Sequence, residues 1–151
     1  MSFLNEHIDN GSHATPLLHR DCCVCGRQSH GDGLNVCFHL DDDGLIRANW
    51  YAEVRWQGYR GQIHGGAIAM LLDGAMTHCL LARQITAVTG RINIRYIAPM
   101  LVGSDVEIQA RLIDRMPPLF ITEASVRHQG EMIARADAKF MQVADDYFSR
   151  Q

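Results

Sequence analysis

The segment best suited to chemistry begins with two adjacent glycines and contains a single acid. His64-Gly65-Gly66 precedes a run rich in Ala, Met and Leu, and Asp73 lies within that run. If the run is a helix, its first N–H groups are unpaired and its dipole adds about half a positive charge there. Glycine has no Cβ, so a ligand oxygen could approach these donors closely. The glycines could equally serve only to give the loop a tight entry into the helix.

Asp73 is an unusual residue for the middle of an apolar helix. Aspartate is a mediocre helix former and is rarely buried without a partner. The plain alternative is a stripe that faces solvent, but Ala69, Met70, Met76 and Leu80 on that stripe are all uncharged. With an ordinary pKa of about 3.9 the carboxyl group is ionised at neutral pH. Asp73 would therefore act as a base or a nucleophile rather than as an acid.

The spacing between these two features constrains the assembly. Gly65 and Asp73 are eight residues apart, which is about 12 Å along a helix. One small carbonyl group cannot contact both from the same helix. If both act on one substrate, they must come from two copies of the helix that lie side by side in opposite directions. Catalysis therefore predicts a homodimer with two equivalent, shared sites.

The surrounding sequence predicts the elements that hold these residues. Residues 64–83 lack β-branched residues for most of their length and predict a buried helix. Alternating segments separated by short turns predict an antiparallel sheet. The expected strands are 34–40, 45–54, 87–98, 105–113, 119–129 and 132–143. The sequence thus predicts an α+β fold in which a curved antiparallel sheet wraps around one long central helix.

Composition limits the class of protein. The 151 residues suit one domain, with residues 1–20 as a flexible lead-in and 21–147 as the folded unit. A net charge of −3 without a basic cluster disfavours binding to nucleic acid or anionic membranes. Residues 67–82 form the longest apolar stretch, which is interrupted and short for a bilayer. Without an export signal, the five cysteines predict reduced thiols and a cytoplasmic location.

Four residues near the N-terminus have a spacing that could bind zinc. They are His19, Cys22, Cys25 and His30. A second pair of ligands at a secure spacing is missing, and a lone Cys-x-x-Cys is common in buried turns. The sequence therefore favours reduced structural thiols, and we expect no metal and no cofactor.

Residues 58–73, Gly-Tyr-Arg-Gly-Gln-Ile-His-Gly-Gly-Ala-Ile-Ala-Met-Leu-Leu-Asp, resemble the signature of the PaaI-type branch of hotdog-fold thioesterases. That signature is a Gly-Tyr-x-Gly loop, His-Gly-Gly, and an acid nine residues after the histidine. Supporting similarity comes from Thr89-x-x-x-Asn93-Ile94-x-Tyr96-x-x-Pro99, Cys22-x-x-Cys25-Gly26 and Gly33-Leu34. The resemblance covers about residues 22–143. It implies a hotdog fold and an acyl-CoA thioesterase that works as a homodimer or a dimer of dimers (a homotetramer).

The resemblance also implies a role for each matching position. The Gly65 N–H would polarise the thioester carbonyl, beside Gly66, and His64 would shape the turn. Asp73 of the neighbouring subunit would activate water or attack the carbonyl directly. Thr89 would supply a hydroxyl that holds the water or the carboxylate. The products would be a carboxylic acid and a free thiol.

Two positions depart from the family pattern. Relatives often have Asn or Gln six residues before the histidine, where this sequence has Gly58. We hypothesise that the adjacent Gln57 takes over that role. Many relatives also follow the acid with Glu, where this sequence has Gly74, so Asp73 is the one acid on the expected helix.

Two arginines on the strand after the helix have two interpretations. Arg91 and Arg95 alternate with apolar residues, which is typical of a solvated or subunit-facing side of a sheet. Arginine also matches the geometry of phosphate groups. Under the second interpretation Arg91 and Arg95 would bind the phosphates of CoA.

Two other functions compete with thioester hydrolysis. A non-catalytic acyl-CoA-binding or regulatory hotdog domain would explain the missing amide at Gly58. A hydratase acting on enoyl thioesters is weaker, because it needs a histidine and an acid that converge on one carbon. Acyl chain length, aryl or alkyl preference, and CoA or acyl carrier protein as the thiol all remain open. So does the choice between base and nucleophile for Asp73.

Overall fold

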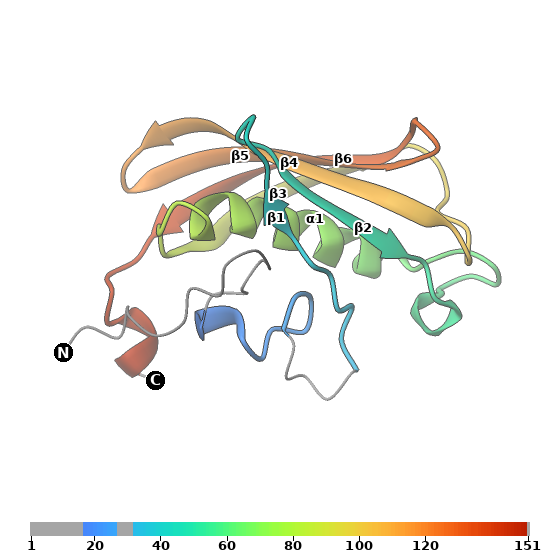
Figure 1. The fold of residues 1–151 in the computed structure, drawn as a ribbon, viewed down its shortest axis with the longest axis horizontal. Coiled ribbons are helices and arrows are strands. Elements are labelled where there is room, and N and C mark those ends of the chain that lie inside the picture. The colour runs from blue at the N-terminus through green and yellow to red at the C-terminus, as the bar shows by residue number, and fades with distance from the viewer. Residues whose placement is uncertain (1–16, 27–31, 151) are drawn as a thin grey trace.

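A curved sheet packed on one long helix forms the body of the molecule (Figure 1). The computed structural model describes residues 17–26 and 32–150. Within them the strands are β1 (His39–Leu40), β2 (Ile46–Tyr51), β3 (Ala87–Tyr96), β4 (Asp105–Met116), β5 (Leu119–His128) and β6 (Glu131–Gln142). They lie in the order β1-β2-β4-β5-β6-β3, and every neighbouring pair is antiparallel. The helix α1 (Gly65–Leu81) covers one face. The predicted α+β architecture is confirmed.

The helix is buried on most of its surface, as its composition predicts. Its buried residues are Ala67, Ile68, Leu71, Leu72, Gly74, Ala75, Met76, His78, Cys79 and Leu80. Strand β5 alternates between buried and partly exposed residues, so one of its faces packs against this helix. The large side chains Phe120 and Phe140 are almost completely buried in the same core. Burial of this apolar surface provides the main driving force for the fold.

Most predicted elements are present, with ends that differ by a few residues. The strand predicted over 45–54 ends at Tyr51, because the chain then turns into a 3-10 helix, η2 (Val54–Trp56). The strand predicted over 34–40 is wrong for most of its length, since only His39–Leu40 pairs with β2. The preceding residues bond elsewhere: the N–H groups of Leu34 and Val36 donate to the carbonyls of Cys23 and Val24, each at 2.8 Å.

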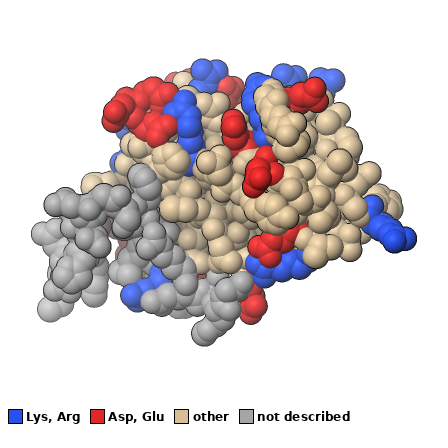
Figure 2. Space-filling view, turned by 45° about the vertical axis from the view of Figure 1, so that its right-hand side comes forward, with Lys and Arg blue, Asp and Glu red and all other residues tan. Residues whose placement is uncertain are grey.

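A short 3-10 helix lies at each end of the described chain. Of the predicted lead-in, residues 1–16 lie outside the described residues, and Leu17–His19 forms the 3-10 helix η1. After β6 comes another 3-10 helix, η3 (Tyr147–Arg150). No helix in the described ranges is long and apolar enough to cross a membrane. On the face shown in Figure 2, acidic and basic side chains are interspersed around a broad uncharged area.

Candidate active site

The start of α1 leaves one backbone donor unpaired. His64 is the N-cap, and its Nδ1 accepts a hydrogen bond from the Gly66 N–H at 2.8 Å. The N–H groups of Ala67 and Ile68 donate to the His64 carbonyl at 2.9 and 3.3 Å. The Gly65 N–H has no acceptor in the described part of the chain. Of the two glycines proposed as donors, only Gly65 therefore offers its N–H to a ligand.

Two glycines make room for the His64 side chain. A Cβ at Gly66 would lie 3.0 Å from His64 Nδ1, and a Cβ at Gly58 would lie 3.1 Å from His64 Cδ2. Either contact would force the imidazole to shift. Glycine at positions 58 and 66 therefore accommodates the capping histidine in its present position.

Tyr96 at the end of β3 fixes the helix start and was not expected to do so. Its hydroxyl donates to the Gly65 carbonyl at 2.8 Å. Its ring borders the open side of Gly65, where an added Cβ would meet ring atoms at 3.5 Å. In the sequence Tyr96 stood out only as part of the family-like strand, and the pattern did not show that it reaches back to the helix.

Asp73 is half-buried and is held by a single hydroxyl. Thr89 Oγ1 donates to Asp73 Oδ1 at 2.8 Å, and no described residue donates to Oδ2. Burial raises the pKa of Asp73 above its ordinary value, while the Thr89 hydrogen bond lowers it. The result is a carboxylate of increased basicity with one oxygen available to a water molecule or a substrate.

An irregularity in β3 explains how Thr89 reaches Asp73. Thr89 pairs with the buried Phe140, but Arg91 pairs with its neighbour Lys139, so Gly90 is an extra residue in the strand. Such a bulge changes which face the flanking side chains point to. It places Thr89 on the helix side of the sheet and Arg91 on the opposite side.

One side-chain atom of Gln57 forms a hydrogen bond within the loop that contains Gln57. Its Oε1 accepts a hydrogen bond from the Gly61 N–H at 3.2 Å. The loop is closed further by the Gly58 N–H, which donates to the Gln62 carbonyl at 2.9 Å. The Gln57 amide nitrogen has no acceptor among residues 17–26 and 32–150 and remains available as a donor.

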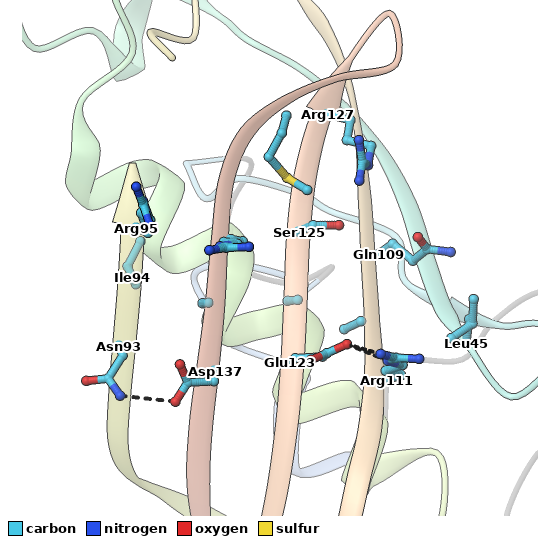
Figure 3. A pocket seen from close by; sticks show the side chains of 15 residues that line it. Leu45, Asn93, Ile94, Arg95, Gln109, Arg111, Glu123, Ser125, Arg127 and Asp137 are labelled. Atoms are coloured by element: carbon cyan, nitrogen blue, oxygen red, sulfur yellow. Dashed lines mark hydrogen bonds and ion pairs between the residues drawn. The ribbon is translucent and has the colours of Figure 1, made fainter. Parts of the chain in front are cut away.

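One large hollow lies away from these groups. It has a volume of about 710 Å³, and residues of β3 to β6, including Arg95 and Asn93, line it. Figure 3 shows its side chains in front of the strands, with α1 behind them. Asn93 Nδ2 donates to Asp137 Oδ2 at 3.0 Å. The hollow is open and polar and contains neither Gly65 nor Asp73. In one chain Arg95 is therefore not brought together with the candidate catalytic groups. Arg91, which pairs with the exposed Lys139, also faces away from α1.

The described part of a single chain thus holds the candidate residues in two separate groups. Gly65, Gly66, His64 and Tyr96 gather at the start of α1. Asp73 and Thr89 form a second pair, eight residues along the same helix, which corresponds to about 12 Å.

Comparison with known proteins supports the predicted family. Residues 60–134, which include α1, β3, β4, β5 and the start of β6, match the family model described as the Thioesterase superfamily. This match agrees with the resemblance that the sequence motif indicated.

The most informative relatives agree with this assignment. Human acyl-coenzyme A thioesterase 13 is 32% identical over 79 residues, covering 50% of this chain and 56% of that protein. The match thus spans about half the length of the curated relative. A Streptococcus mutans protein bound to acetyl CoA has a TM-score of 0.68 at 20% identity, over 73% of this chain and 90% of that one. Escherichia coli PaaI has a TM-score of 0.71 at 15% identity, over 78% and 86%. The hotdog fold is confirmed.

Proposed function

We propose that this protein is an acyl-CoA thioesterase that hydrolyses a thioester to a carboxylic acid and a free thiol. The observation that carries the proposal is the pair of unsatisfied groups on α1. Among the described residues, the Gly65 N–H at the positive end of the helix has no acceptor, and one carboxylate oxygen of Asp73 has no donor. The match to the Thioesterase superfamily supports the reaction class.

The active site in this proposal is shared between two subunits. Strand β3 lies at one edge of the described sheet, so its outer backbone groups are available to pair with a second copy. Tyr96, Ile97 and Leu101 are large apolar residues exposed near the end of β3. Their burial would favour association. An antiparallel arrangement of two α1 helices would then bring Gly65 of one subunit to Asp73 of the partner subunit, in a dimer or a dimer of dimers.

In the proposed cleft, the helix-start N–H stabilises negative charge on the substrate and the carboxylate accepts a proton from water. The Gly65 N–H donates to the thioester oxygen as negative charge develops on it, a contribution typically on the order of 10²–10³ in rate. Asp73 of the partner subunit removes a proton from water as the water oxygen attacks the carbonyl carbon. The tetrahedral intermediate then collapses, the C–S bond breaks, and the thiolate takes up a proton. A positioned base contributes on the order of 10²–10⁴.

A covalent route uses the same groups. An Asp73 oxygen attacks the carbonyl carbon, the thiolate leaves, and water hydrolyses the resulting anhydride. Single turnover in ¹⁸O-labelled water separates the routes. Label in the Asp73 carboxylate requires the covalent route, because water must then have attacked the aspartyl carbonyl of the anhydride.

Remaining roles are assigned to the residues around these two groups. Thr89 holds the carboxylate, His64 and Gly66 shape the donor site, and the Gln57 amide nitrogen is placed to donate to substrate or water. We assign Arg91 and Arg95 to the phosphates of CoA, since arginine suits phosphate geometry. Both point away from Asp73 in one chain, so this assignment places the phosphates on the face of the sheet opposite α1. The expected cytoplasmic location is part of the same proposal.

A screen for released thiol tests the function directly. The protein is mixed with a panel of short, long and aryl acyl-CoA esters, and free thiol is measured with a colorimetric reagent. We expect turnover on at least one ester and loss by orders of magnitude in Asp73→Asn. Normal turnover in Asp73→Asn would refute the role of this residue.

The second candidate is a non-catalytic acyl-CoA-binding domain. It is favoured by Gly58, which leaves the site without the amide that many relatives carry. It predicts saturable binding of CoA esters without thiol release in the same screen.

A further inference from the structure

Three potential metal ligands converge in the N-terminal turn, outside the proposed catalytic groups. One ligand atom each from His19, Cys22 and Cys25 lies within 4.8 Å of the other two. Cys25 Sγ is 3.6 Å from His19 Nδ1. Two sulfurs and one imidazole nitrogen are the donors that zinc prefers in proteins. The fourth residue with suitable spacing, His30, lies outside the described residues.

Backbone hydrogen bonds fix the turn that carries the two cysteines. The Cys22 N–H donates to the His19 carbonyl at 3.1 Å, and the Gly26 N–H donates to the Cys22 carbonyl at 2.8 Å. The Val24 N–H points at Cys22 Sγ from 3.4 Å, a contact that stabilises a thiolate. A Cβ at Gly26 would lie 2.5 Å from Cys22 N. Only glycine fits there, so the turn holds both sulfurs toward one point.

A buried histidine of α1 lacks a hydrogen-bond partner beside this turn. His78 is only 7% exposed, and its Nε2 has no partner in the described part of the molecule. Its ring centroid lies 6.1 Å from that of His19. Two imidazoles on one tetrahedral zinc, with Zn–N bonds of about 2.1 Å, have ring centres roughly 5 Å apart. The separation of the two rings is therefore somewhat longer than a shared ion requires, and His78 would have to move closer to bind with His19.

The turn is docked on the helix that carries Asp73. Figure 1 draws it in blue, on the side of α1 that faces away from the sheet. A Cβ at Gly74 would lie 2.7 Å from Val24 Cγ1. Glycine at this position therefore leaves the space in which Val24 packs against the helix. The Gly74 that replaces the acidic residue of many relatives is explained by this contact.

We propose that His19, Cys22 and Cys25 bind a zinc-class divalent ion, with His78 as the fourth ligand. Binding releases the two thiol protons to solvent and forms two metal–sulfur bonds. The ion would fasten the N-terminal turn to α1 next to Asp73 and would supply a partner for the buried His78 nitrogen. The site is separate from Gly65 and Asp73 and does not depend on the proposed hydrolase activity.

Metal analysis of the full chain, purified without an affinity tag, tests this proposal. After incubation with Zn²⁺ and desalting, mass spectrometry of the elements should find roughly one zinc per chain, since one tetrahedral site is proposed. Cys22→Ser/Cys25→Ser should lose the zinc. The matched control is Cys23→Ser/Cys37→Ser, which removes two exposed cysteines and should retain it. Wild-type protein without zinc, or a double variant at 22 and 25 that binds as much as wild type, would overturn the site.

A second measurement avoids dependence on how the variants fold. Wild-type chain is alkylated with and without a strong chelator, and the modified cysteines are mapped by mass spectrometry. Cys22 and Cys25 should be protected until the chelator is added, while Cys23 and Cys37 react in both samples. Substitution with Co²⁺ should give thiolate charge-transfer bands, weakened or shifted in His78→Gln. A metal-free Cys22–Cys25 disulfide, or reaction independent of the chelator, would contradict the proposal.

Discussion

Asp73 is subject to opposing influences on its carboxyl group. Burial raises its pKa, the hydrogen bond from Thr89 lowers it, and the charges of Cys22 and His19 have smaller opposing effects. Burial has the larger effect, so the group is a stronger base than an exposed aspartate. The same burial implies a cost in stability, because an ionised carboxylate is held partly out of water. Both consequences can be measured on single variants.

Removal of the Thr89 hydroxyl should change the pH dependence of the reaction. In Thr89→Val the carboxylate loses the donor that stabilises its charge, so the pKa of Asp73 should rise. The acid limb of the kcat/KM profile should therefore move to higher pH. Thr89→Ser keeps a hydroxyl and should leave the limb close to wild type. Identical profiles for the Val and Ser variants would show that Thr89 does not tune this group.

Replacement of Asp73 by Asn should stabilise the fold at neutral pH. The pKa of Asp73 is higher in the folded than in the unfolded chain, so the folded state binds this proton more tightly. The free energy of unfolding therefore falls as pH rises through the interval between the two values, and the cost is fully present once the pH exceeds the folded-state pKa. Asp73→Asn should have the higher Tm there. The difference should vanish below about pH 3.9, the ordinary pKa of aspartate, where wild type is also neutral. A lower Tm for the variant at pH 7 would contradict this assignment.

At the scale of elements, the helix start can be tested without breaking the helix. Proline is tolerated at the first helical position and removes the N–H. His64 has φ −60° and ψ 135°, a conformation that suits the residue before proline. Gly65→Pro should therefore fold normally and lower kcat by on the order of 10²–10³, the typical loss for one such donor. Circular dichroism checks the helix. Gly65→Ala, which keeps the N–H, is the matched control.

The elements show what sequence patterns capture and what they miss. The helix and most strands were predictable, because burial repeats at a local period. The segment from Leu34 was misassigned, because its partner is the turn at Cys23 and Val24 and not the sheet. Alternation would place Thr89 on the face of Arg91, and only the bulge at Gly90 reverses this. The pairing of Tyr96 with Gly65 likewise joins residues far apart in sequence.

At the scale of the whole molecule, the proposed function requires two copies of the chain. The sequence predicted roles for Gly65 and Asp73 and their action in different copies, and both stay predictions. It could not predict which donor at the helix start is unpaired in the described part of the chain, because that depends on the hydrogen bond between His64 and Gly66. Association would use β3, which lies at one edge of the described sheet.

Mixing two inactive variants tests the shared site most directly. Gly65→Pro and Asp73→Asn are each nearly inactive as homodimers. A heterodimer contains one intact site, formed by Gly65 of one chain and Asp73 of the partner subunit. Random re-association should therefore restore about a quarter of the wild-type activity, since half of the dimers are mixed and each has one working site of two. Mixed dimers that form, as shown by native mass spectrometry, but release no more thiol than the parents would contradict the account.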